Sequence, residues 1–409
     1  MTGRSQWLYF SMYSFFADKE RMHLSNLKPV WLESLSQIDR QAWDALARPL
    51  RTPFLEWDWL RLMEASGSTI PQAGWVPRYL TLWSGRELAA AAPLYIKLHS
   101  EGEFVFDHAW ADVAGRLGRA YYPKLVGMSP FTPMIGYRFL MAPGIDEEGL
   151  TARMLKEIDR FCRRHGLAGS SFHFVDPLWG EILDRHGYCA WIHQSFVWKN
   201  EGYGSFEDYL SGFNSNQRRN IRRERLELSR RGIRVEMIPG AELPRSFYER
   251  MYAYYARTND RFGPWSCKYL TRQFFTGLPD HFSQRLVFAT AFEDNRRDAP
   301  VGMSLLVAKA DQLYGRYWGC RREIEFLHFD ACYYRPIEWA IHHGIQAFDP
   351  GMGGGHKLRR GFKAVANRSL HRFMDPTLRQ IMEHNMDAIN RLEQSHIAAL
   401  NQGLPLRRP

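Results

Sequence analysis

An order of secondary-structure elements that occurs twice along the 409 residues constrains the fold more than any other feature of the sequence. In each half, two stretches rich in apolar residues are separated by a short turn, which predicts a pair of adjacent strands. The two strand pairs are expected at residues 78–83 with 88–96 and at residues 285–292 with 301–308.

A helix and a further strand follow each strand pair. Apolar residues with helical spacing precede Gly166 in the first half and Gly344 in the second, and glycine commonly ends a helix. Strands are then expected at 171–175 and 345–348. A helix that ends in glycine before a strand is common, so chance similarity is the alternative. The repeated order predicts an α/β (mixed α+β) chain with two domains of one kind in tandem.

The remaining segments connect and flank these units. The apolar stretch at 7–16 is expected to be a packed or partly ordered arm, because charged residues and no cleavage site follow it. A largely helical segment is expected at 205–233, and an amphipathic helix at 376–400 with a frayed tail at 404–409. The predicted division is an N-terminal arm at 1–28, a first domain at 29–200, a second domain at 201–375 that begins with an arginine-rich helix, and a C-terminal helix and tail at 376–409.

Composition is that of an ordinary globular protein, with 45% hydrophobic and 24% charged residues. The formal net charge of +10 favours polyanionic partners such as nucleic acid, nucleotide-linked substrates or an acidic membrane surface. Five widely spaced cysteines without a C-x-x-C pair indicate neither a disulfide framework nor a zinc site, so no metal is expected. A reducing cytoplasm fits best, and no run approaches the roughly 20 apolar residues of a membrane-spanning helix.

Residues 348–362 concentrate flexible backbone and positive charge directly after a predicted strand. Glycines that let several backbone N–H groups converge are followed by basic residues: Gly351, Gly353, Gly354, Gly355, His356, Lys357, Arg359 and Arg360. Such a loop suits an anionic group. It is not a nucleotide-triphosphatase loop, because Leu358 stands where that motif requires a hydroxyl. A glycine-rich connection with a merely solvated basic tail is the alternative.

A run of arginines at 218–225 lies on nearly every side of two expected helical turns. Only Glu224 and Glu227 are available to pair with these arginines along the helix, so their mutual repulsion favours an external anion. Arginine also contacts phosphate oxygens with two hydrogen bonds. The candidate contacts to phosphate or tRNA are Arg218, Arg219, Arg222 and Arg223. A plain solvated face is the alternative.

Many ordered motifs resemble those of one bacterial protein family. The arginine run and the following Arg230-Arg231-Gly232-Ile233-Arg234-Val235 resemble the R-x-x-I-R-R-x-[RK] … G-[IV]-x-V stretch of FemAB-like proteins. Further motifs resemble a family of predicted N-acyltransferases labelled peptidoglycan biosynthesis/recognition. They lie at residues 75–80, 92–97, 103–112, 121–125, 130–133, 316–320 and 327–334. The resemblance runs from about residue 53 to residue 373.

The resemblance implies two tandem GNAT-like domains and transfer of an acyl group, most often an aminoacyl group, to an amine. Better-studied relatives take that group from aminoacyl-tRNA and add it to a peptidoglycan precursor, so aminoacyl-tRNA is the implied co-substrate and no bound cofactor is expected. Two departures stand out. In the family's F-E-x-G-A-Q-G-E-H-K motif, Gly353 replaces the Gln and Gly355 replaces the Glu. Pro336 falls within a family helix, which is expected to begin or kink there.

An acyl-CoA donor is an alternative to aminoacyl-tRNA. GNAT enzymes that use acyl-CoA bind its pyrophosphate with R/Q-x-x-G-x-G/A between a strand and a helix. The match at residues 163–168 stands instead at the end of an expected helix, which weakens this alternative. The glycine loop could still bind such a donor with another geometry.

Aminoacyl transfer from an ester to an amine needs positioning and a polarised carbonyl rather than a protein nucleophile. We therefore expect direct attack by the amine. His356 and Lys357 are candidates to stabilise the developing oxyanion or the leaving ribose oxygen, and Asp112 is a candidate to orient or deprotonate the amine. The alternatives are that His356 and Lys357 only cap a loop, and that Asp112 is a structural carboxylate beside Trp110.

Residues that contact substrate are expected in the same groove. Lys124 and Arg316 are candidate groove cations on the strength of the resemblance, and Phe131 and Thr132 form a short rigid loop between two prolines. The candidate substrate contacts are Lys124, Arg316, Trp110, Phe131, Thr132, Gly353, Gly354 and Gly355. A cytoplasmic aminoacyltransferase is the leading hypothesis. A non-catalytic protein that binds cell-wall precursors or RNA is the second, and turnover of charged tRNA separates the two.

Overall fold

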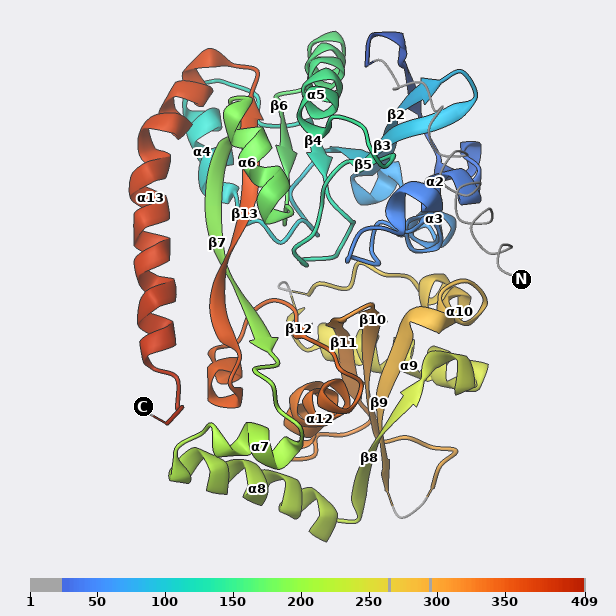
Figure 1. Cartoon of the computed structure of the whole chain (residues 1–409), viewed down its shortest axis with the longest axis vertical. Helices are drawn as coiled ribbons and strands as arrows, with labels where there is room; N and C mark the ends of the chain where they lie inside the picture. Colours follow the sequence, from blue (N-terminus) through green and yellow to red (C-terminus); the bar gives the residue numbers. More distant parts are fainter. Residues whose placement is uncertain (1–23, 264–265, 294–295, 408–409) are drawn as a thin grey trace, which may run out of the picture.

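The computed structural model describes residues 24–263, 266–293 and 296–407, so the arm expected at 7–16 lies outside the described residues. One extended sheet runs through the described chain, and helices cover it (Figure 1). The strand order is β1-β2-β3-β4-β6-β13-β7-β12-β11-β10-β9-β8, and β5 pairs with β3 off this path. The first half of the chain supplies one end of the sheet and the second half supplies the other end.

The elements of the first half are β1 (Lys28–Leu32), α2 (Arg40–Ala47), α3 (Trp57–Ala65), β2 (Trp75–Ser84), β3 (Glu87–Lys97), α4 (His108–Arg116), β4 (Lys124–Gly127), β5 (Leu140–Met141), α5 (Glu147–Arg164), β6 (Gly169–Phe172), α6 (Pro177–Arg185) and β7 (Cys189–Lys199). The elements of the second half are α7 (Phe206–Ser211), α8 (Ser215–Arg230), β8 (Ile233–Pro239), α9 (Arg245–Asp260), α10 (Arg272–His281), β9 (Leu286–Glu293), β10 (Gly302–Lys309), β11 (Gln312–Cys320), α11 (Leu327–Phe329), a π-helical turn (Asp330–Tyr334), α12 (Arg335–His342), β12 (Ala347–Asp349), a 3₁₀ segment η9 (Gly355–Arg360), β13 (Lys363–Phe373) and α13 (Pro376–Gln402).

The repeated order of elements that the sequence predicts is present in the structure. β2 pairs antiparallel with β3 in the first half, and β9 pairs antiparallel with β10 in the second. A helical crossover then joins two parallel strands: α5 precedes β6, which pairs with β4, and α12 precedes β12, which pairs with β11. Each half therefore contains an antiparallel meander followed by one parallel strand pair.

The two halves exchange strands at the centre of the sheet. β13 comes from the second half, yet it pairs with β6 of the first half, and β7 of the first half pairs with β12 of the second. β7 and β13 also pair with each other from Lys363 opposite Val197 to His371 opposite Cys189. Figure 1 shows both strands running from one half into the other. No finding fixes a boundary between separate domains, so the division at residues 200 and 201 stays a prediction.

Three local expectations are refined by the structure. The helical segment expected at 205–233 is two helices, because the chain breaks after α7 and the Asn214 side chain caps α8 by accepting a hydrogen bond from the Gln217 N–H. Pro336 stands in the first turn of α12, directly after the π-helical turn. The tail is not frayed over its described part, because Leu406 forms a β-bridge with Phe213.

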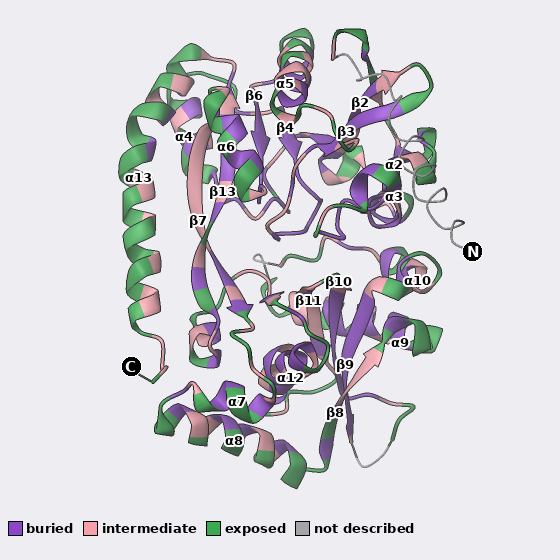
Figure 2. Cartoon of the chain, viewed as in Figure 1, coloured by how far each residue is buried: buried purple, intermediate pink, exposed green. Residues whose placement is uncertain are grey.

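Burial follows the amphipathic patterns of the sequence. Figure 2 shows buried residues concentrated on the strands and on the inner sides of the helices, with exposed residues along the outer sides of α8 and α13. The expected closing helix α13 covers β7 and β13, and its buried Leu378, Met382 and Met386 belong to a small apolar cluster with Trp110 and Phe373. This helix secures the two strands that both halves use.

Candidate active site between the two halves

A cavity opens where strands β11 and β12 diverge. The two strands pair only over three positions, from Gln312 opposite Ala347 to Tyr314 opposite Asp349, and β11 then continues to Cys320 paired with β10 but not with β12. The resulting cavity has a volume of about 540 Å³. Residues of β11, of the π-helical turn and of the glycine-rich loop line it, among them Arg316, Trp318, Tyr333, Gly353, His356 and Lys357.

A β-bulge in β11 places Arg316 at this cavity. Leu305 of β10 lies opposite Tyr317 and Leu306 lies opposite Gly315, which leaves Arg316 as the extra residue. A bulge of this kind redirects a side chain from the regular alternation of a strand. The Arg316 guanidinium donates to the backbone carbonyl of Phe131 (2.7 Å) and to the hydroxyl of Thr132 (3.3 Å). Three predicted substrate residues thus come together across the two halves.

The backbone at Phe131 is held in an unusual conformation. Its φ of +54° is rare for a bulky residue, and such strain commonly persists where surrounding contacts impose it. Here the Phe131 ring stacks on Tyr269, while the Phe131 carbonyl accepts the hydrogen bond from Arg316. Thr132 is buried and donates to the carbonyl of Pro130 (2.8 Å). These contacts hold the loop against Arg316, and Phe131 and Pro133 form part of the lining of an adjoining cavity.

A second cavity of about 350 Å³ adjoins the first one. The two cavities share six lining residues: Phe262, Gly315, Arg316, Tyr317, Trp318 and Met352. Phe104 and Phe131 of the first half and Tyr255 of α9 line only the second cavity. Both halves therefore contribute to one continuous site.

Lys357 lies buried at the loop end of the larger cavity, with 2% of its surface exposed. Its ammonium group donates to the carbonyl oxygens of Gly351 (2.6 Å) and Met352 (3.0 Å). Burial lowers the pKa of Lys357 to about 8, although the nearby Asp349 carboxylate opposes this decrease. A lysine with a pKa near neutrality in a cavity is a candidate functional group.

Asp349 is a residue of the site that the sequence analysis did not single out. Its carboxylate accepts a hydrogen bond from the Gly351 N–H (2.9 Å), which shapes the start of the loop. Burial raises the pKa of Asp349 to about 6, and the Gly351 N–H and the charges of Lys357 and Arg316 limit that rise. The available signal was an acidic residue at the end of a strand, immediately before a glycine-rich loop.

His356 lies beside Lys357 as a neutral imidazole. Its Nε2 is 2.8 Å from the Tyr333 hydroxyl. Burial, together with the charges of Arg360 and Lys357, lowers the pKa of His356 to about 4. The neighbouring Gly354 has a φ of +87°, and a Cβ at this position would collide with the His356 ring. His356 can therefore donate or accept one hydrogen bond at neutral pH, but it is not a cation.

The cavity also contains a thiol, that of Cys332. Burial raises the pKa of Cys332 to about 12, so the group is a neutral thiol at physiological pH and a poor nucleophile. This state of Cys332 agrees with the expectation of direct attack by an amine.

Helix α8 connects the arginine run to the glycine-rich loop. On its inner face, Glu224 accepts hydrogen bonds from the Tyr334 hydroxyl (2.5 Å) and from Arg360 (3.1 Å). Arg360 in turn donates to the carbonyl of His356 (2.8 Å). Among the predicted phosphate contacts, Arg219, Arg222 and Arg223 are exposed, while Arg218 is half-buried and donates to the carbonyl of Phe213. The outer face of the helix is basic, although Arg222 also pairs with Glu207.

The structure places three predicted residues away from the cavity. Lys124 is not a groove cation, because it is 3% exposed and its ammonium group pairs with Glu103 (2.8 Å) and with Asp107. Asp112 is exposed on α4, and Trp110 packs in the apolar cluster beneath α13. None of these three residues lines either of the two adjoining cavities, and Gly355 and Thr132 also lie outside their linings. The residues that line the cavity but were missed include Tyr317, Trp318, His328 and Tyr333.

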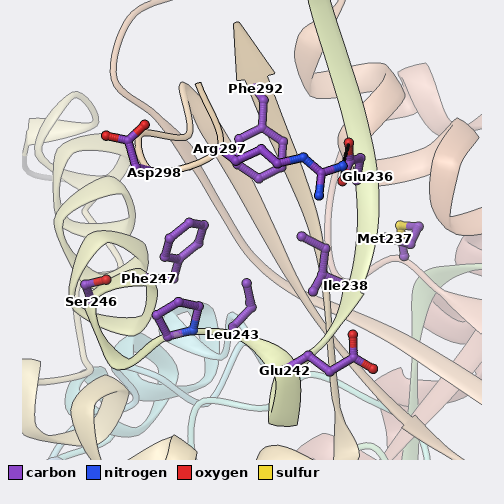
Figure 3. A pocket seen from close by; sticks show the side chains of 11 residues that line it. Glu236, Met237, Ile238, Glu242, Leu243, Ser246, Phe247, Phe292, Arg297 and Asp298 are labelled. Carbon is purple, nitrogen blue, oxygen red and sulfur yellow. Dashed lines mark hydrogen bonds and ion pairs between the residues drawn. The ribbon is translucent and has the colours of Figure 1, made fainter. Parts of the chain in front are cut away.

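A further cavity of about 580 Å³ lies between β8, α9 and the turn after β9. Figure 3 shows Phe247 and Ile238 on opposite sides of this space, with Arg297 directed toward Glu236. The Arg297 guanidinium and the Glu236 carboxylate form an ion pair (2.9 Å) at the exposed surface. None of the candidate residues lies there, so we place the active site at the β11–β12 divergence.

The match at residues 163–168 to the acyl-CoA pyrophosphate motif occupies the C-terminal end of α5 and the turn after it. A helix C-terminus presents carbonyl oxygens rather than N–H groups, so this segment is unsuited to a pyrophosphate. Over the described residues, no helix is both long and apolar enough to cross a membrane.

Comparisons with known proteins identify the family. The model of the FemAB-like family, described as peptidoglycan biosynthesis/recognition, matches residues 34–408. The structure of FemX is similar to this chain with a TM-score of 0.51 and 12% identity, over 87% of this chain and 100% of FemX. The C-terminal domain of a predicted lysylphosphatidylglycerol synthetase from Agrobacterium fabrum has a TM-score of 0.51 and 9% identity, over 86% of this chain and 96% of that domain.

A tandem GNAT protein from the clavulanic acid biosynthesis pathway has a TM-score of 0.42 and 12% identity, over 86% of this chain and 99% of that protein. No curated protein matches the chain. The predicted mixed α/β fold and the predicted class of N-acyltransferases are confirmed together with the family. The chain belongs to the FemAB-like family of peptidoglycan biosynthesis/recognition proteins.

Proposed function

We propose that this protein transfers an aminoacyl group from aminoacyl-tRNA to the amine of a peptidoglycan precursor or of a related acceptor. The observation that carries the proposal is the position of Lys357, a buried lysine with a lowered pKa, in a cavity at the diverging strands β11 and β12. The match to the FemAB-like family supports aminoacyl transfer as the type of reaction.

In the proposed reaction, the acceptor nitrogen attacks the carbonyl carbon of the ester. A C–N bond forms, the C–O bond to the ribose breaks, the amine loses a proton and the ribose oxygen gains one. The Lys357 ammonium can stabilise the negative charge that develops on the carbonyl oxygen or on the leaving oxygen. Lys357 is held for this role by the carbonyl oxygens of Gly351 and Met352. His356 and Tyr333 supply a further neutral hydrogen-bonding pair beside it.

The basic outer face of α8 supports a polyanionic donor. Arg219 and Arg223 are exposed on this face, and Glu224 and Arg360 on its inner side connect the helix to the backbone of His356. A nucleic acid bound to α8 would therefore contact the element that borders the loop of Lys357. Arginine side chains suit such contact because they bind phosphate oxygens with two hydrogen bonds.

Turnover is the test of this proposal. The purified protein is incubated with charged tRNA and a panel of amine acceptors, and formation of the amide is followed by mass spectrometry. We expect amide formation with the parent protein and a strong decrease with Lys357→Ala. Transfer from acyl-CoA in place of charged tRNA would replace the proposed donor. Binding of tRNA or precursor without any transfer would support the non-catalytic alternative and overturn the proposal.

A further inference from the structure

We infer that the group transferred at this site carries an uncharged, apolar side chain, and that this side chain occupies the smaller cavity beside Arg316. This inference rests on the proposed aminoacyl transfer and specifies its substrate class. The inference predicts that the site accepts donors with aromatic or aliphatic side chains. It predicts that lysyl, arginyl and acidic aminoacyl donors are poor substrates.

The smaller cavity has an apolar and aromatic lining. Its walls include Phe104, Phe131, Pro133, Tyr255, Phe262 and Met352. Aromatic and aliphatic surfaces of this kind stabilise a ligand mainly by removing its apolar surface from water. A volume of about 350 Å³ exceeds that of any single amino-acid side chain, so polarity rather than size selects the occupant.

The charges around the two cavities exclude a cationic side chain. Among the described residues that line either cavity there is no Asp or Glu, whereas Arg316 and Lys357 are both present. The Asp349 carboxylate lies outside both linings and already accepts a hydrogen bond from the Gly351 N–H. The two imidazoles of the larger cavity are neutral, because burial is the main cause that lowers the pKa of His328 to about 3 and that of His356 to about 4. A lysyl or arginyl side chain would lose its hydration without gaining a carboxylate partner.

An acidic side chain is disfavoured for a different reason. Arg316 is the charged residue in the lining of the smaller cavity. One terminal nitrogen of its guanidinium donates to the Phe131 carbonyl, the Thr132 hydroxyl and the Tyr317 hydroxyl (2.8 Å), while its buried Nε has no hydrogen-bond partner among the described residues. Redirecting this group toward a ligand would break the contacts that join the two halves. The terminal nitrogen that makes these contacts would gain little from a new partner, and the buried Nε is not exposed to a ligand.

The lining residues that the two cavities share allow one donor to occupy both cavities in a single orientation. Lys357 lines only the larger cavity, and Phe104 and Tyr255 line only the smaller one. An ester whose carbonyl lies near Lys357 can extend its side chain past Arg316 and Met352 into the aromatic space. The α-amine of an aminoacyl ester is less basic than a lysine side-chain amine. In this orientation the α-amine lies near the ester rather than in the apolar cavity.

Binding of small amides tests the inference without requiring transfer. Phenylalanine amide, leucine amide, lysine amide and the α-amide of glutamic acid are titrated into the full chain by calorimetry. We expect the phenylalanine and leucine amides to bind at least about tenfold more tightly than the two charged amides. Equal or tighter binding of lysine amide would overturn the inference.

A variant with an added carboxylate makes the test sharper. Thr258 on α9 lines the smaller cavity and is half-buried, so Thr258→Asp adds a negative charge to the wall with little change in size. We expect this variant to shift the ratio of phenylalanine to lysine affinity by about tenfold toward lysine, while the uncharged Thr258→Asn control leaves the ratio unchanged. An unchanged ratio in a folded Thr258→Asp protein, checked by its circular dichroism, would contradict the assigned location.

Transfer assays separate this inference from the proposed function. With a panel of charged tRNAs, fastest transfer of lysine or glutamate would leave aminoacyl transfer standing and overturn the inferred side-chain class. Selective binding of apolar amides without transfer from any charged tRNA would support the inferred side-chain class and overturn the proposed aminoacyl transfer.

Discussion

The two halves of the molecule use the same parallel strand pair in opposite ways. In the first half, the space beside β4 and β6 is filled: a Cβ on Gly127 would collide with Tyr137 and Phe172, and Lys124 at the start of β4 pairs with two buried carboxylates. In the second half, β11 and β12 diverge and leave a cavity of about 540 Å³. Side chains therefore fill the space beside β4 and β6, whereas the space where β11 and β12 diverge is a cavity that can hold a substrate.

The contrast is clearest at two buried lysines. Burial alone would lower the pKa of Lys124, but Glu103 and Asp107 outweigh that effect and raise its pKa above the ordinary value. At Lys357, burial prevails over the single opposing carboxylate of Asp349, and its pKa falls to about 8. A buried charge with partners of opposite sign belongs to the structure, whereas an under-compensated one remains available for chemistry.

The largest expected effect is on stability in the first half. Lys124→Met should lower the free energy of unfolding by about 3–5 kcal/mol, because Glu103 and Asp107 would stay buried without a cation. Chemical denaturation measures this loss, with the exposed Lys156→Met as the control. The effect should shrink at acidic pH, where the stranded carboxylates can take up protons. A Lys124→Met protein as stable as the control at pH 7 would refute the structural assignment of this lysine.

The corresponding change in the second half should affect activity rather than folding. Lys357→Ala should lower kcat by about 10²–10³-fold, the range for removal of one group that stabilises a developing oxyanion. Thermal melting should change little, because the lost ammonium was only partly compensated. The control is Lys363→Ala, whose side chain is half-exposed and paired with Glu201 at the surface. Normal turnover by Lys357→Ala would remove the loop from the active site.

A smaller effect is expected from the basic face of α8. Replacement of Arg218, Arg219, Arg222 and Arg223 by Ala should weaken tRNA binding, and each lost phosphate contact should reduce the salt slope by about 0.9 for duplex regions. The exposed arginines Arg219 and Arg223 should account for most of the loss, because Arg218 and Arg222 have protein partners. Arg163→Ala with Arg164→Ala, at the exposed end of α5, is the matched control. If the salt slope of tRNA affinity is the same in the α8 variant and in the α5 control, the arginine run is a solvated surface that does not contact phosphate.

The smallest effect concerns pH. Because the pKa of Lys357 is lowered to about 8, its ammonium is present below pH 8 and is lost as the pH rises through that value. The pH profile of kcat/KM should therefore fall above about pH 8. Lys357→Arg keeps its charge at all these pH values, so its residual activity should lack this alkaline decrease. If the parent protein and Lys357→Arg show the same decrease of kcat/KM above pH 8, the decrease is caused by a group other than Lys357.

Local patterns in the sequence predicted much of the fold but only part of the site. Strand pairs such as 78–83 with 88–96 could be predicted because apolar stretches and turns are local features of the sequence. The glycine-rich loop could be predicted for the same reason. The structural role of Lys124 could not be predicted, because its partners Glu103 and Asp107 are brought to it by tertiary contacts. The pairing of β13 with β6 was equally hidden, since strand register between distant segments leaves no local pattern.

The exchange of β7 and β13 has a consequence for the protein during its synthesis. The sheet of the first half is complete only when residues 363–373 pair with β6 and β7, and these residues leave the ribosome after all of β8 to β12 has been made. Until then, the edges of β6 and β7 that receive β13 lack their partner, and such open edges invite pairing with other chains. The first half therefore cannot mature as an independent unit while the second is being made. Production of the amino-terminal half alone should yield aggregating material, and addition of the carboxy-terminal half during refolding should rescue it.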